Sequence, residues 1–306
     1  MSEHITHIAI YEDTNRLICH SKDFNLPFKN SLKHYPDAGL VSSGARGNHL
    51  LAIPIIEKVR DDWETGYKKA RYGELLAASI GWLSHRAIDL QVKPNYIKQK
   101  DIKDPRFSTY EQQIYCDAMT FDKVYGAGVH PSISPMVSMS KATLEYGMQS
   151  HPAAESTYVR QLEPIMVQMV QQQLLSIRKF NSESTSTDEW FDAYEDEYQK
   201  TSENLNVYIE AFVNPDPLKV EKYLEDFNFY NPEDEIIQLA RELQHLGNSE
   251  LDIDEAVEKG KSQSQYAQGL SRSYRFNKSA QAFFEKKIEK DDVYDQVEIF
   301  YEPHRI

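Results

Sequence analysis

An uncharged stretch from residue 75 to residue 84, followed at once by a histidine and an aspartate, constrains the fold of this sequence more than any other feature. It reads Leu-Leu-Ala-Ala-Ser-Ile-Gly-Trp-Leu-Ser and continues with His-Arg-Ala-Ile-Asp. If the stretch is a helix, His85 and Asp89 share a face with Ala78 and Trp82. The opposite stripe is apolar: Leu76, Ile80, Leu83 and Ala87. Both faces therefore belong inside the protein.

A buried imidazole and a buried carboxylate one turn apart need a partner, because unpaired charge is costly away from water. A metal ion would satisfy both His85 and Asp89. A hydrogen bond within the helix, or an ion pair with a basic residue such as Arg46, would also satisfy them, and a spacing of four residues is common. These two side chains are the first functional candidates.

Composition indicates a protein that folds without covalent crosslinks. The 306 residues include only two cysteines, Cys19 and Cys116, too few for a disulfide framework or a cysteine zinc site. The N-terminal segment lacks the features of a signal peptide, and no segment contains 18 uncharged apolar residues. We expect a soluble, cytoplasmic protein without a transmembrane segment, for which homo-oligomerisation stays open.

Charge is distributed unevenly. Residues 181–260 carry 22 acidic and five basic side chains, a net charge of −17, whereas the whole chain carries −14. The remaining residues therefore carry a net charge of about +3. The part of the chain that holds the candidate site would not repel an anionic substrate. The sequence shows no stripe of basic residues that could bind the phosphates of duplex nucleic acid. We interpret the acidic block as solvated helix faces.

Spacing of apolar residues predicts an all-α chain. A loop-rich passage is expected over residues 20–47, the central helix should end before Pro94, and residues 293–306 are ambiguous. We predict a helical metal-site domain over residues 1–180 and an acidic helical region over 181–306, which could also pack on the first as one unit. Helices are expected at residues 5–17, 48–62, 72–92, 110–124, 138–150, 154–180, 188–212, 217–228, 232–246 and 253–290.

Further metal-ligating side chains precede the central helix. They are His7, with His4 one turn before it, Asp37 and His49. Mixed histidine and aspartate ligands suit zinc and related divalent ions, and a set without cysteine points to a site with room for water. Such a site can activate water as a nucleophile.

The order of these residues resembles the zinc-dependent phospholipase C family, which shares its helical fold with the P1 and S1 nucleases. The resemblance rests on Thr6-His-Ile-Ala-Ile10, Tyr35-Pro-Asp37, Gly47-Asn-His49 and Gly81-Trp-Leu-Ser-His-Arg-Ala-Ile-Asp89, within residues 4–95. It implies a multi-helix phospholipase C/P1 nuclease-like bundle with additional C-terminal helices. It also implies one or two Zn²⁺ ions: one metal on Asp37, His49, His85 and Asp89, with Asp89 bridging to a second that His7 contacts.

Two parts of the family pattern are missing. A further histidine follows the buried pair in the family, where this chain has Lys93-Pro94-Asn95, and a later His-x-x-x-Glu pair corresponds to Gln113 and Asp117. A third metal site is therefore lost or rebuilt. Glu111, Asp117, His130 and His4 are the additional candidates.

The resemblance implies a metal-dependent phosphodiesterase of the phospholipase C type. Asp37 would be a ligand and a general base, and Arg46 and Arg86 could bind the phosphate of a small phosphate ester or a phospholipid headgroup. The alternative is a helical binding or scaffold protein of the same fold, with a structural metal or none. An HD-type phosphohydrolase would need an adjacent His-Asp doublet, which the sequence lacks.

Overall fold

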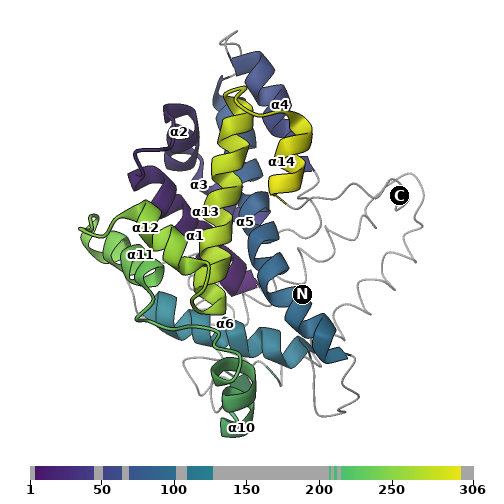
Figure 1. Ribbon diagram of the computed structural model, residues 1–306, viewed down its shortest axis with the longest axis vertical. Helices are drawn as coiled ribbons and strands as arrows, with labels where there is room; N and C mark the ends of the chain where they lie inside the picture. Colours follow the sequence, from purple (N-terminus) through teal and green to yellow (C-terminus); the bar gives the residue numbers. More distant parts are fainter. Residues whose placement is uncertain are drawn as a thin grey trace, which may run out of the picture. The chain divides into compact units, whose positions relative to one another are not determined.

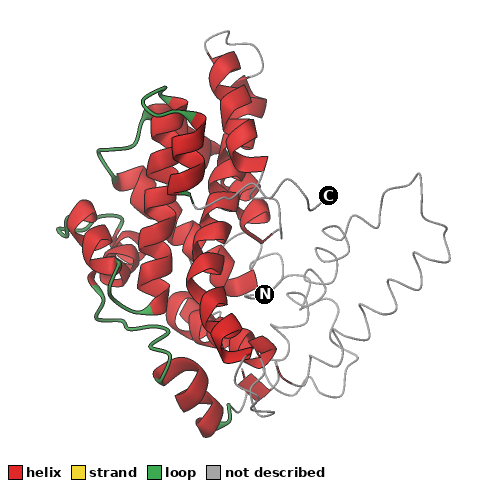
Figure 2. Ribbon diagram, turned by 45° about the vertical axis from the view of Figure 1, so that its right-hand side comes forward, coloured by secondary structure: helices red, strands yellow, loops and turns green. Residues whose placement is uncertain are grey.

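The computed structural model describes residues 4–44, 51–63, 69–100, 109–126, 207, 210–211 and 215–297. Throughout these ranges the regular structure is helical and contains no strand (Figure 2), which confirms the all-α class. None of the described helices has the length and apolarity needed to cross a membrane. The longer helices in the first half are α1 (His4–His20), α2 (Leu26–His34), α3 (Pro36–Gly44), α4 (Ala52–Trp63), α5 (Lys69–Lys100) and α6 (Thr109–Tyr125). The second half contributes α10 (Pro217–Val220), the π-helical turn η3 (Glu221–Glu225), α11 (Glu235–Leu246), α12 (Ile253–Gly260), α13 (Gln265–Phe284) and α14 (Lys290–Gln296) (Figure 1).

Two compact units divide the chain, and each is built from separate stretches of sequence. One combines residues 1–6 with 100–229, and the other combines residues 7–99 with 230–306. Helices α11 to α14 thus share a unit with α2 to α5. The boundary predicted between residues 180 and 181 lies outside the described residues.

Helix α5 forms the core of the second unit, as its sequence predicts. The apolar residues Leu76, Ile80, Leu83 and Ala87 have no exposed surface, and His85 and Asp89 on the other side are also buried. The hydroxyls of two buried serines donate to carbonyls one turn earlier, Ser79 to Leu75 and Ser84 to Ile80. These bonds let polar residues enter the core without losing hydrogen bonds.

Helix α13 packs along α5 (Figure 1). At one contact Ile88 lies over Gly269, so closely that a Cβ on this glycine would lie 2.6 Å from Ile88 Cδ1. Nearby, Gln91 Nε2 donates to the side-chain oxygens of Gln265 and Gln268 at 2.7 and 2.8 Å. A segment near the end of the chain therefore completes the surroundings of the central helix.

The predicted end of α5 before Pro94 is wrong, because the helix continues to Lys100. A proline inside a helix removes one hydrogen bond and crowds the carbonyl four residues earlier, at a cost of about 3 kcal/mol. The buried turns from Leu76 to Val92 hold the helix in place, so this local preference does not end it.

The loop predicted over residues 20–47 is also wrong, because α2 and α3 occupy most of its described part. Asn25 caps α2, its Oδ1 accepting from the Phe28 amide at 3.0 Å. Phe28 and Leu32, one turn apart, are buried, and Pro36 is the first residue of α3, a position that proline favours. The prolines and glycines in the described part of this segment therefore do not mark turns. Its prolines lie at helix starts, and Gly39 lies at a close contact between side chain and backbone.

The other helix predictions are met in part. Helices α1, α4, α6 and α11 match predicted segments, although residues 48–50, at the start of the segment predicted for α4, lie outside the described residues. The single helix predicted over residues 253–290 is wrong, since α12 ends at Gly260 and Ser264 caps a new helix by accepting from the Ala267 amide. The helix predicted at residues 217–228 ends at Glu225. Residues 138–150 and 154–180 lie outside the described part, as does most of 188–212.

Candidate metal centre

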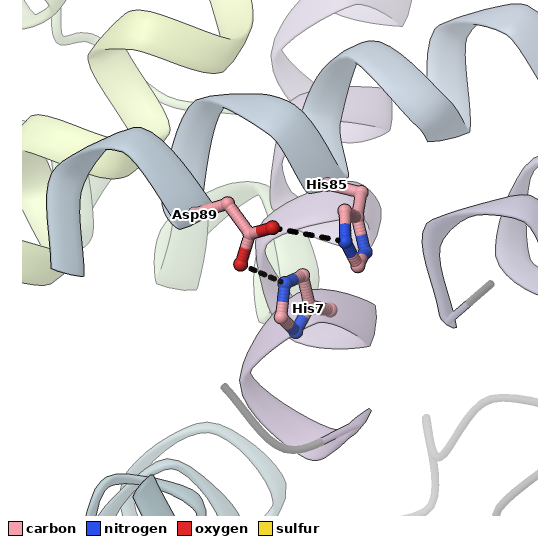
Figure 3. A group of neighbouring side chains, drawn as sticks. All are labelled: His7, His85 and Asp89. Atoms are coloured by element: carbon pink, nitrogen blue, oxygen red, sulfur yellow. Dashed lines mark ion pairs between the residues drawn. The ribbon is translucent and has the colours of Figure 1, made fainter. Parts of the chain in front are cut away.

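Three ligand-type side chains meet in the interior of the second unit: His7 from α1 and His85 and Asp89 from α5. His7 Nε2 lies 3.4 Å from Asp89 Oδ1, and His85 Nε2 lies 3.2 Å from Asp89 Oδ2 (Figure 3). The exposed fractions of the three residues are 2%, 5% and 4%. Together they form a group able to hold a metal ion.

The orientation of His85 is fixed by helix α3. Its Nδ1 lies 2.7 Å from the carbonyl oxygen of Ser43, and since a carbonyl only accepts, Nδ1 carries the proton. In the neutral imidazole, Nε2 then presents its lone pair toward Asp89. A backbone carbonyl in this position is the usual second partner of a metal-binding histidine.

Close packing of α3 against α5 brings this carbonyl to His85. Ser42 Oγ lies 2.7 Å from the carbonyl oxygen of Ala78, to which it donates. A Cβ on Gly81 would overlap the Gly39 carbonyl oxygen and Ser42 Oγ. The glycine in the central stretch thus lets the two backbones approach closely.

The electrostatic environment keeps Asp89 ionised. Burial raises the pKa of Asp89, but the positive charge of a protonated His85, and the hydrogen bonds that protonated His7 and His85 donate, outweigh burial and lower this pKa well below the ordinary value. A carboxylate that stays charged in the interior is a suitable anionic ligand for a divalent cation.

The spacing of donor atoms fits a metal ion. In a tetrahedral zinc site with bonds near 2.0–2.1 Å, neighbouring ligand atoms are about 3.3 Å apart. The two nitrogen–oxygen separations, 3.4 and 3.2 Å, bracket this value. The ligand atoms of all three residues lie within 4.8 Å of one another. These separations are compatible with a shared ion.

Other predicted site residues lie elsewhere or outside the described residues. Asp37 is exposed in the first turn of α3 and does not belong to the group. Arg86, next to His85 in α5, is half-buried. The structure does not describe His49, Arg46, His130 or the side chain of His4.

Two candidates on α6 have partners in the first unit. Glu111 Oε2 accepts from the Tyr223 hydroxyl at 3.0 Å, and Oε1 lies 3.4 Å from Lys219 Nζ. Asp117 accepts hydrogen bonds from Ile5 and Thr6. Neither belongs to the His7, His85 and Asp89 group.

Among the residues that the structure describes, Ser43 contributes its carbonyl to the site although no sequence pattern predicted it. Its contribution comes from a backbone atom, so residue type carries no direct signal of it. The glycine at position 81 was an indirect signal, because a glycine inside a buried helix often marks a close backbone approach.

Comparisons with protein-family models, with curated proteins and with solved structures found no match. The geometry of His7, His85, Asp89 and the Ser43 carbonyl is therefore what supports a metal centre.

Proposed function

We propose that the protein is a metal-dependent hydrolase of phosphate esters, of the phosphodiesterase or phospholipase C type. The observation that carries the proposal is the buried group of His7, His85 and Asp89, which supplies two imidazoles and one ionised carboxylate within reach of a common ion.

These three residues would hold one or two divalent cations, with Zn²⁺ favoured by the nitrogen and oxygen donors. Each imidazole faces a different oxygen of Asp89, so the carboxylate could serve one ion or lie between two. When bound, such a cation polarises a phosphoryl oxygen and makes water a better nucleophile near neutral pH. The Ser43 carbonyl holds His85 in the required tautomer.

Substrate contacts would come from groups beside the buried three. Arg86 follows His85 in α5, and a guanidinium matches the geometry of phosphate oxygens. The proposed substrates are small phosphodiesters, including phospholipid headgroup esters. Asp37 is exposed and outside the group, so we do not assign it the general-base role.

The deep burial of His7, His85 and Asp89 favours a second function. All three residues are at least nine-tenths buried, and an imidazolium next to Asp89 would satisfy its charge without a metal. A helical binding or scaffold protein, with a structural metal or none, would retain such a group. The hydrolase requires both bound metal and turnover, whereas the scaffold requires neither.

The decisive experiment measures metal content by mass spectrometry and then hydrolysis of bis(p-nitrophenyl) phosphate by the same preparation. We expect Zn²⁺ or a similar ion in the purified protein, and loss of both metal and turnover in His85→Ala and Asp89→Ala. His34→Ala changes an exposed histidine outside the group and should match the wild type. Bound metal without turnover would support the scaffold, whereas a chain that binds no metal on titration would exclude the hydrolase.

A further inference from the structure

The carboxylate of Asp117 on α6 accepts hydrogen bonds from the first turn of α1. Its Oδ2 lies 3.0 Å from the amide nitrogen of Ile5, and its Oδ1 lies 2.8 Å from the amide nitrogen and 2.6 Å from Oγ1 of Thr6. Asp117 is only 1% exposed. All of these atoms belong to the unit formed by residues 1–6 and 100–229.

This contact satisfies groups that a helix cannot satisfy by itself. The first four amides of an α-helix have no acceptor within the helix, and Ile5 and Thr6 lie in the first turn of α1, which begins at His4. A carboxylate there supplies acceptors and places negative charge at the positive end of the helix dipole. Asp117 therefore caps α1 from a distant part of the chain.

His7 directly follows the two residues that Asp117 holds. The first turn of a helix frays readily, and a frayed turn would allow the His7 ring to rotate away from Asp89. We propose that Asp117 is a positioning residue, which fixes the start of α1 so that His7 Nε2 faces Asp89 Oδ1. The importance of this role for catalysis rests on the proposed hydrolase function, but the positioning itself does not.

The first test needs no metal. In chelator-treated protein, ¹⁵N NMR of the histidine rings compares wild type with Asp117→Ala. We expect the His7 ring resonances to shift or broaden while those of His85 stay in place, and hydrogen exchange at the Ile5 and Thr6 amides to accelerate at least tenfold. Asp117→Asn, which keeps one acceptor oxygen, should show a smaller change and replaces the alanine variant if that one does not fold.

A matched control separates positioning from a general loss of packing. Thr120 Oγ1 lies 3.2 Å from Thr6 Oγ1 and donates to the Cys116 carbonyl. Thr120→Val removes this buried hydroxyl but leaves the carboxylate and both α1 amides. It should reduce stability without moving the His7 ring resonances. Unchanged His7 resonances in Asp117→Ala, or equal changes in Thr120→Val, would overturn the proposal.

The second test measures the affinity of the protein for Co²⁺ and the absorption spectrum of the bound ion. Loss of an outer contact of a metal site typically weakens binding about 10- to 100-fold, and we expect this from Asp117→Ala in the wild-type background. In a His7→Ala background the same change should have no further effect, and an equal loss there would contradict positioning through His7. If the wild type binds no metal, the hydrolase proposal fails while the ring resonances still decide the role of Asp117.

Discussion

The imidazole rings of His7 and His85 are stacked, with centroids 4.0 Å apart and planes inclined by 20°. Two protonated rings at this separation would repel each other, whereas two neutral rings can share a cation. In the proposed metal centre the bound cation would supply the positive charge next to Asp89.

Metal removal should lower the stability of the protein. A ligand present at 100 times its Kd stabilises the folded state by about 2.7 kcal/mol, so chelation should lower the Tm and added Zn²⁺ should restore it. Differential scanning calorimetry with and without chelator measures this shift. In His85→Ala the Tm should no longer respond to Zn²⁺. A wild-type Tm that is the same in chelator and in excess Zn²⁺ would contradict a bound metal.

Replacement of Gly81 by alanine should damage both fold and site. The added Cβ would overlap the Gly39 carbonyl and Ser42 Oγ, and forcing such overlap typically costs about 1–3 kcal/mol or more. Moving α3 would also withdraw the Ser43 carbonyl from His85. Urea denaturation and Zn²⁺ titration should therefore both show a loss. Gly260→Ala is the matched helical control, since its nearest contact would be Ser271 Cβ at 3.1 Å, and a Gly81→Ala protein equal to it would argue against the close approach.

Asp13 should be among the most sensitive positions for stability. Its carboxylate is fully buried, pairs with Arg16 at 2.6 Å and with Arg241, and accepts from the Tyr266 hydroxyl at 2.8 Å. Removing one partner of a buried ion pair typically costs about 3–5 kcal/mol. We expect Asp13→Ala to reduce the free energy of unfolding by this amount in urea denaturation.

An exposed ion pair provides the comparison for Asp13. Asp23, whose side chain is 41% exposed, pairs with Lys278. Asp23→Asn should cost at most about 1 kcal/mol, because solvent screens such pairs. Similar losses in the two variants would show that the Asp13 cluster does not connect α1, α11 and α13 as strongly as its burial indicates.

The pH dependence of stability should include a contribution from Glu285. Partial burial raises the pKa of Glu285, but bonds with Lys287 and Asn25 outweigh burial and lower its pKa below the ordinary value. A carboxyl group with a lowered pKa stabilises the folded state above its unfolded pKa, and this contribution disappears as pH falls through the folded value. Glu285→Gln should therefore cost about 0.5 kcal/mol at pH 7 and nothing well below about pH 4. Urea denaturation at both pH values measures the difference, and an equal cost at both would exclude the ion pair as its source.

Hydrophobic spacing predicted the central helix and the burial of His85 and Asp89, because periodicity directly reports which faces of a helix leave water. His7 and Asp37 were candidates because of their residue types, and the resemblance gave both the role of metal ligands. The structure brings His7 to Asp89, whereas Asp37 is exposed. Residue order does not encode the direction of a side chain on a short helix such as α3.

Glycine and proline account for two errors in the predicted fold, the loop over residues 20–47 and the end of the central helix. They signal turns when considered alone, but here Pro36 starts a helix, Pro94 lies within one, and Gly39 accommodates the ring of Tyr11. These roles depend on neighbours distant in sequence. The break after α12 likewise depends on Asp234, whose Oδ2 accepts from the Ser264 amide at 3.0 Å.

The interleaved organisation of the chain also affects the order of events during synthesis. Ile88, one residue before Asp89, packs on Gly269 of α13, so the ribosome must add some 180 residues before that contact can form. At about 5–20 residues per second this takes roughly ten to forty seconds. During that interval the apolar side of α5 lacks this partner, and the exposed apolar surface makes the nascent chain a target for chaperones.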